Sequence, residues 1–121
     1  MQRSIFAAVS LFAFLGAAQA QPSCVYPKAP RSIPIGAIAT HEEIVEAHKQ
    51  VKQFDEDIRT YNICLELELK ALEENTEIDE ERKDQQRLML ARKSNAAIDE
   101  VQMVVNRFNE QLRAYRKRTD K

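Results

Sequence analysis

Apolar side chains recur every three or four residues over two long stretches of the chain, which is the spacing of one face of an α-helix. In the first stretch, nine positions from 44 to 72 follow this spacing, and only Glu68 is not apolar. The other eight are Ile44, Ala47, Val51, Phe54, Ile58, Tyr61, Leu65 and Leu72. Thr40 and Glu43 have the spacing of a capping box, which marks the start of a helix. The pattern therefore predicts a helix over residues 40–73.

The second stretch has the same spacing at Ala91, Ser94, Ile98, Val101, Val105, Phe108, Leu112 and Tyr115. Between the stretches, residues 73–76 lack an apolar position and contain Asn75 and Thr76, which favours a turn. Thr76 with Asp79 resembles a capping box for a second helix over residues 77–117. Neither stretch contains Pro or Gly. The sequence thus predicts an all-α fold, in which residues 40–118 form a long antiparallel, coiled-coil-like hairpin of two helices.

Residues 21–39 differ from the helical stretches because they hold all four prolines and Gly36. Proline fixes φ and has no N–H to donate, so this segment should be extended and polyproline-like. It also contains apolar residues that favour burial: Val25, Tyr26, Ile33, Ile35 and Ile38. We therefore expect a strap that lies over the groove between the helices.

The first twenty residues have the three parts of a secretory signal peptide. Arg3 supplies a positive start, residues 4–16 form an apolar run, and Ala18-Gln19-Ala20 matches a cleavage site. A retained membrane anchor is the alternative, but the apolar run is too short to span a bilayer comfortably. We expect a mature chain that begins at Gln21, has no transmembrane segment and is exported to the periplasm or secreted.

Cys24 and Cys64 are the two cysteines of the chain. An even number in an exported protein predicts one intramolecular disulfide, which would stabilise the fold by ~4 kcal/mol. Cys64 should lie ~36 Å along the first helix from Thr40, and a polyproline strap of sixteen residues can reach ~50 Å. A redox pair would usually have C-x-x-C spacing, and a metal site would need more ligands.

The sequence contains no recognisable catalytic motif. His41 and Glu42 begin like a zinc-binding H-E-x-x-H motif, but Val45 occupies the second histidine position. No serine has a nucleophile setting, and no glycine-rich phosphate loop is present. The sequence therefore predicts no enzyme, no cofactor and no metal. The 17 basic and 19 acidic residues after position 20 also argue against a nucleic-acid partner.

Function is instead expected from exposed surface. Several apolar residues fall outside the two regular series, among them Leu67, Leu69, Leu88, Met89 and Met103. Four basic residues gather near the C-terminus: Arg113, Arg116, Lys117 and Arg118. They suit either an anionic partner or the negative end of their own helix dipole. We predict a non-catalytic adaptor or holdase-like protein of the cell envelope, which binds an envelope protein or a second copy of itself. A self-assembling structural coiled coil and an all-helical enzyme are the alternatives.

Several fragments together resemble a group of small exported helical proteins of proteobacteria. They are Cys24, Ile33-Pro34-x-Gly36, Ala39-Thr40, Tyr61-x-x-Cys64-Leu65 and Arg107-Phe108-Asn109-Glu110-Gln111. The resemblance covers most of the chain after residue 20 and implies a periplasmic helical protein. It implies no particular activity.

Overall fold

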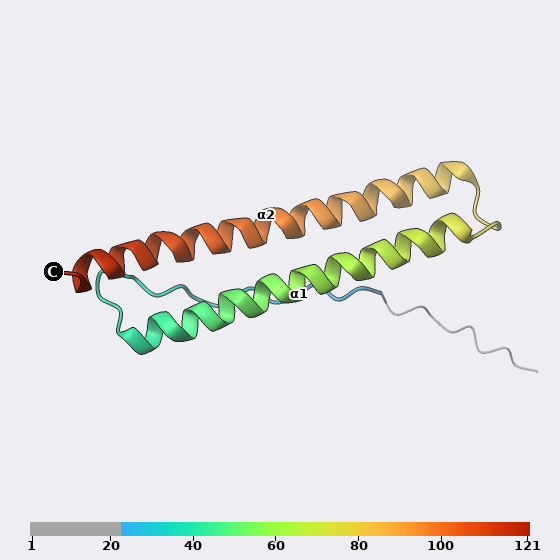
Figure 1. Ribbon diagram of the computed structural model, residues 1–121. Helices are drawn as coiled ribbons and strands as arrows, with labels where there is room; N and C mark the ends of the chain where they lie inside the picture. The colour runs from blue at the N-terminus through green and yellow to red at the C-terminus, as the bar shows by residue number, and fades with distance from the viewer. Residues whose placement is uncertain (1–22) are drawn as a thin grey trace, which may run out of the picture.

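The computed structural model of the chain describes residues 23–121, and in this range it contains two α-helices and no strand. Helix α1 spans His41–Glu74 and helix α2 spans Glu80–Thr119. They lie side by side and run in opposite directions, so that the end of α2 lies beside the start of α1 (Figure 1). We call this end of the hairpin the open end and the connection between the helices the tip. The predicted all-α hairpin is confirmed, whereas the predicted signal peptide over 1–20 lies outside the described residues.

Helix α1 starts where its sequence predicts. The Glu43 backbone N–H donates to the Thr40 hydroxyl at 3.2 Å, and the Thr40 N–H donates to the Glu43 carboxylate at 2.8 Å. These reciprocal bonds satisfy two N–H groups that have no partner within the helix. Ala39 and Ile44 are buried in one cluster on either side of the cap. All eight predicted apolar positions of α1 are buried.

Helix α2 starts three residues later than expected, and the prediction of Thr76 as its cap is wrong. Asp79 is the N-cap, because its carboxylate accepts the Arg82 N–H at 3.0 Å. Asn75 instead holds the turn by accepting the Glu77 N–H at 2.9 Å. The carboxylates of Glu80 and of Asp79 lie at the positive end of the α2 dipole, which favours a helix start at this point.

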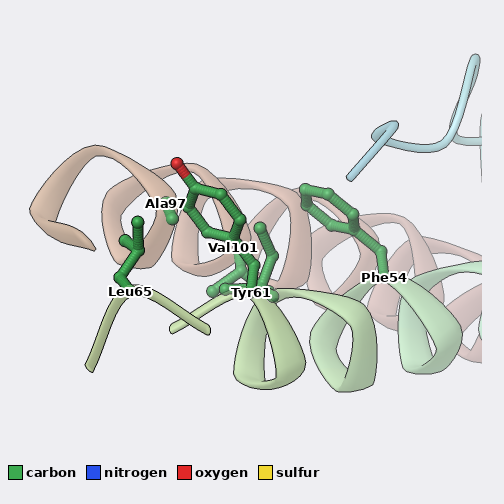
Figure 2. Packing of buried hydrophobic residues seen from close by; sticks show 6 residues of the cluster. Phe54, Tyr61, Leu65, Ala97 and Val101 are labelled. Carbon is green, nitrogen blue, oxygen red and sulfur yellow. The ribbon is translucent and has the colours of Figure 1, made fainter. Parts of the chain in front are cut away.

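The core consists of two clusters between the helices. In the one nearer the tip, four α1 residues pack against Ala97 and Val101 of α2; they are Phe54, Ile58, Tyr61 and Leu65 (Figure 2). In the one nearer the open end, α1 residues surround Phe108. The apolar face of α2 is rotated relative to the predicted series: Ala97 is 0% exposed, whereas Ile98 is 39% exposed and Ala91 is exposed. A small residue at 97 lets the helix backbones approach closely, which a larger side chain there would prevent.

The strap, residues 23–39, runs along the groove between the helices without regular secondary structure (Figure 1). Cys24 and Ala29 pack on the cluster nearer the tip, and Ile33 packs on the other cluster. The strap therefore acts as a third layer over one side of a two-helix core. Within the described residues, neither helix is long and apolar enough to cross a membrane.

Candidate interaction surfaces of the hairpin

The strap is fixed to α1 by a disulfide between Cys24 and Cys64, whose Cα atoms are 5.8 Å apart. This confirms the predicted pairing. Beside it, the Cys24 N–H donates to the Glu68 carboxylate at 2.9 Å, which explains why Glu68 interrupts the apolar series of α1. Cys24, Cys64 and Glu68 have ligand atoms close together, but both sulfurs are in the disulfide, so no thiolate is left to bind a metal ion.

Tyr26 makes the next contact between the strap and the helices. Its ring packs edge-on against Tyr61 of α1 at 5.1 Å, and its hydroxyl donates to the Glu100 carboxylate of α2. Burial and the adjacent Glu100 carboxylate raise the pKa of Tyr26 to about 12, because both disfavour the phenolate. Tyr26 is thus a single strap residue that contacts both helices.

At the open end, the strap touches the backbone of α2. The Gly36 N–H donates to the Gln111 side-chain oxygen at 2.9 Å. A Cβ at Gly36 would lie 1.8 Å from the Gln111 carbonyl oxygen and 2.9 Å from the Tyr115 nitrogen. Only glycine fits this approach. One helical turn further on, the Arg118 guanidinium donates to the Ala39 carbonyl.

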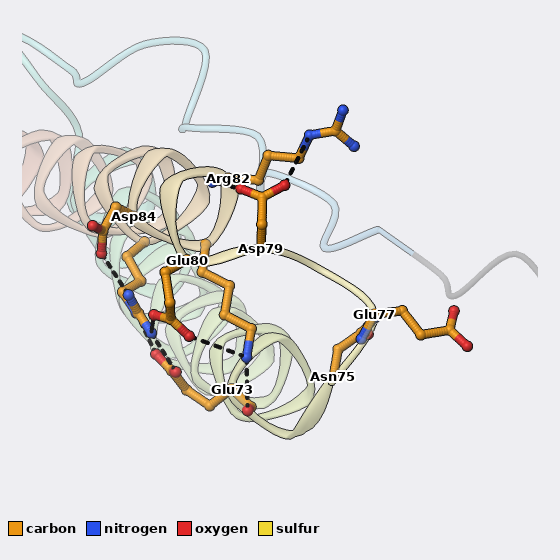
Figure 3. A network of polar contacts seen from close by, with 9 residues as sticks. Glu73, Asn75, Glu77, Asp79, Glu80, Arg82 and Asp84 are labelled. Carbon is orange, nitrogen blue, oxygen red and sulfur yellow. Dashed lines mark hydrogen bonds and ion pairs between the residues drawn. The ribbon is translucent and has the colours of Figure 1, made fainter.

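The tip is held by a network of charges (Figure 3). The Arg87 guanidinium binds the Glu73 carboxylate across the two helices, at 2.5 and 2.6 Å, and also binds Asp84. Hydrogen bonds from Arg87 lower the pKa of Glu73. Lys83 is 7% exposed and donates to the Glu73 carbonyl at 3.3 Å. The sequence reading missed this network, although Lys83, Arg87 and Leu90 follow the spacing of four and three that marks the inner face of α2.

The strap fills one of the two grooves of the hairpin, and the described residues leave the other uncovered. We call this second one the open groove. Near the tip it forms a cleft of about 430 Å³. Its lining is Asn62, Leu65, Glu66, Leu69, Glu73, Arg87, Leu90, Ala91, Ser94 and Asn95. The Oδ1 atom of Asn62 is buried there without a hydrogen-bond partner among residues 23–121.

The five apolar residues predicted as one surface are dispersed over the molecule. Leu69 lines the open groove, whereas Met89 lines a different cleft beyond Ser23 on the strap side. Leu67, Leu88 and Met103 are 64%, 53% and 58% exposed and line neither cleft. Leu67 and Leu69 are two residues apart and so point to different sides of α1, and Leu88 and Met89 are adjacent and so point to different sides of α2.

The basic residues and histidines have separate environments. Arg113, Arg116 and Lys117 are exposed, while Arg118 bonds to Ala39 and lies over the Tyr115 ring at 5.4 Å. Arg118 therefore joins the last turns of α2 to the end of the strap. The His41 ring nitrogen lies 3.3 Å from the Tyr115 hydroxyl, and the His48 ring stacks on Phe108 at 5.9 Å. Each histidine contacts a different aromatic residue, so they do not converge on a common site.

Comparison with known protein families, with curated proteins and with solved structures found no match to this chain.

Proposed function

We propose that this chain is a non-catalytic interaction protein of the bacterial cell envelope, and that it binds a protein partner along the open groove. The observation that carries the proposal is the asymmetry of the two grooves. The strap covers one groove and is held there by the Cys24–Cys64 disulfide, while the open groove keeps an apolar lining and an unbonded Asn62 Oδ1. A groove of this kind along a helix pair suits a helical or extended protein segment.

The absence of a catalytic role is supported by the nature of the buried residues. Among the described residues, Lys83 is the only charged or polar side chain in the buried class, and it is occupied at the tip by Glu73 and Glu80. Catalysis would need polar groups that converge on a cavity. The cleft of the open groove and the cleft beside Ser23 are both open at the surface and do not enclose a cavity.

Export to the periplasm belongs to the same proposal. The signal-like pattern over 1–20, the disulfide and the resemblance to small exported proteobacterial proteins all support it. The direct test is mass spectrometry of the protein isolated from the envelope. The measured mass should be that of a chain beginning at Gln21. An intact N-terminus, or a cytoplasmic pool with both thiols reduced, would contradict export.

The interaction itself is tested by photo-cross-linking in the envelope. A photoreactive residue at Asn95, in the open groove, should give a discrete cross-linked product. The matched control is Met103, which is 58% exposed on the same helix and lies outside the groove. Equal yields from both positions, or no product from Asn95, would contradict the proposed function.

A further inference from the structure

We propose that the open groove binds a second copy of this chain, packed antiparallel, so that two hairpins form a four-helix bundle centred on Asn62. This inference rests on the proposed function, because it names the partner of the same groove. Three features of the open side carry it: an apolar stripe on α2, a self-complementary series of charges on α1, and the unbonded polar atom of Asn62.

The apolar stripe of α2 continues beyond the part that α1 covers. Ala91 lines the open groove, and Ile98, Val105 and Leu112 follow it at intervals of seven residues. Seven residues are nearly two helical turns, so these side chains lie on one side of α2. Ala91 and Ile98 are exposed, and Val105 and Leu112 are half-buried. Val105 and Leu112 also pack on the core clusters, so the part of this line that the hairpin leaves in contact with water is Ala91 and Ile98.

The charges of α1 on the same side are arranged to match a reversed copy of themselves. Glu66 and Glu73 line the open groove, and Arg59 and Lys52 precede them at the same interval of seven. The series from the open end to the tip is thus two bases followed by two acids. When two such helices lie antiparallel about the midpoint of Arg59 and Glu66, Arg59 faces Glu66 and Lys52 faces Glu73. A parallel arrangement would place like charges together.

The alignment that pairs these charges also brings the two copies of Asn62 together. The midpoint of positions 59 and 66 lies between 62 and 63, so Asn62 of one copy comes opposite Ile63 of the other, one residue away from the second Asn62. The Asn62 Oδ1 atom is buried within its own hairpin. Each amide offers both a donor and an acceptor, so the two amides bond to each other when the Asn62 side chain turns toward the second copy. A single buried Asn pair is a known device for fixing register and orientation in coiled coils.

Two present contacts adjoin this interface. Arg59 binds Asp55 of its own helix at 2.9 Å, with the Arg59 side chain 75% exposed, and Glu73 binds Arg87. Both ion pairs are at the surface, so their charged groups can also form ion pairs with a second copy. The helices would overlap over residues 51–74 of α1, about 36 Å in length. Two helix widths of ~10 Å each then give roughly 700 Å² per copy, near the size of a stable interface.

The test is the association state of the disulfide-bonded protein from residue 21 onwards, measured by sedimentation velocity over a concentration series up to about 1 mM. The wild-type chain should show twice the monomer mass. Glu66→Arg should weaken the dimer at least tenfold, because it puts like charges opposite Arg59 twice in each dimer. The matched control Glu56→Arg reverses a charge on the outer face of α1 and should change nothing.

Orientation is tested by exchanging the charges. Arg59→Glu alone should weaken the dimer, and the double variant Arg59→Glu/Glu66→Arg should recover it to within about threefold of the wild type. Ala91→Arg, which adds bulk in the groove at an exposed position, should also abolish the dimer without changing helix content.

Several results would overturn the inference. They are a wild-type monomer at every concentration, an equal effect of Glu56→Arg, or a double variant no better than the single ones. A monomer that still gives a groove-specific cross-link to another envelope protein overturns the dimer and leaves the proposed function standing. A monomer without any such cross-link overturns both.

Discussion

The close approach of Gly36 to α2 leads to a prediction for Gly36→Ala. No described residue of the chain has a positive φ, so this substitution introduces no backbone strain of its own and tests the close approach alone. The added methyl group would lie 1.8 Å from the Gln111 carbonyl oxygen and 2.7 Å from its carbonyl carbon. Both atoms belong to the backbone of a long helix, which cannot yield without breaking its own hydrogen bonds. The strap must therefore move away.

The size of the effect follows from the contacts that the strap would lose. An ordinary contact between carbon and oxygen is about 3.3 Å, so the strap must retreat by roughly 1.5 Å. This breaks the 2.9 Å hydrogen bond from the Gly36 N–H to Gln111, worth about 1 kcal/mol. Partial exposure of Ile33 and Ala39, which pack on the neighbouring cluster, adds about 1–2 kcal/mol. We expect a loss of about 2–3 kcal/mol, confined to the strap, since the helices keep their own core.

The assay is urea unfolding together with hydrogen exchange resolved by peptide. Exchange should rise over residues 33–39 and change little in α1 and α2. Ala37→Ser is the control, because it adds one heavy atom at the adjacent exposed position. Gln111→Ala should cost only about 1 kcal/mol and should not rescue Gly36→Ala, because the clash is with the backbone carbonyl. Wild-type stability and wild-type protection of the strap in Gly36→Ala would refute this reasoning.

Three further predictions concern the strap and the tip. Cys64→Ser should reduce the free energy of unfolding by ~4 kcal/mol and should raise hydrogen exchange in the strap more than in the helices; a uniform rise would count against it. The pKa of Glu73 is lowered in the fold. Its contribution to the free energy of unfolding is therefore present above pH 4.5 and is lost as the pH falls through the lowered pKa. The difference in thermal stability between the wild type and Arg87→Met should therefore shrink under acid conditions, and a difference that does not shrink at any acid pH would argue against the pair. The pKa of Tyr26 is raised from 10.0 to about 12 in the fold. Its contribution to the free energy of unfolding is therefore fully present below pH 10 and is lost as the pH rises towards 12. In absorbance titrations, Glu100→Gln should lower the pKa of Tyr26, whereas an unchanged titration would contradict the contact.

The residues of α1 show how much a local pattern can determine. The capping box at Thr40 and the spacing of three and four from Ile44 to Leu72 specify the start of this helix and its buried face. Both depend on neighbours within a few residues along the chain, and an isolated helix already has these neighbours. The disulfide also follows from the sequence, because only two cysteines are present and the strap is long enough to join them.

Helix α2 shows where a local pattern is insufficient. Its sequence offers two adjacent apolar series, one through Ile98 and one through Ala97, and periodicity alone does not choose between them. The choice depends on how closely α1 approaches, and Ala97 packs near Tyr61 and Leu65 of α1 (Figure 2). The same holds for Glu68, which breaks the local pattern but binds the Cys24 N–H.

The sequence by itself therefore determined the two helices, the extended strap and the disulfide that joins them. Tertiary structure decided which groove the strap occupies, why Gly36 must be glycine, and which apolar residues remain together on the open groove. The predicted set from Leu67 to Met103 was dispersed over several faces, and Leu69 is its one member in that groove. The physical reason is that exposure depends on contacts between segments far apart in the chain. A periodic pattern records which residues share a helix face but not which face a distant segment covers.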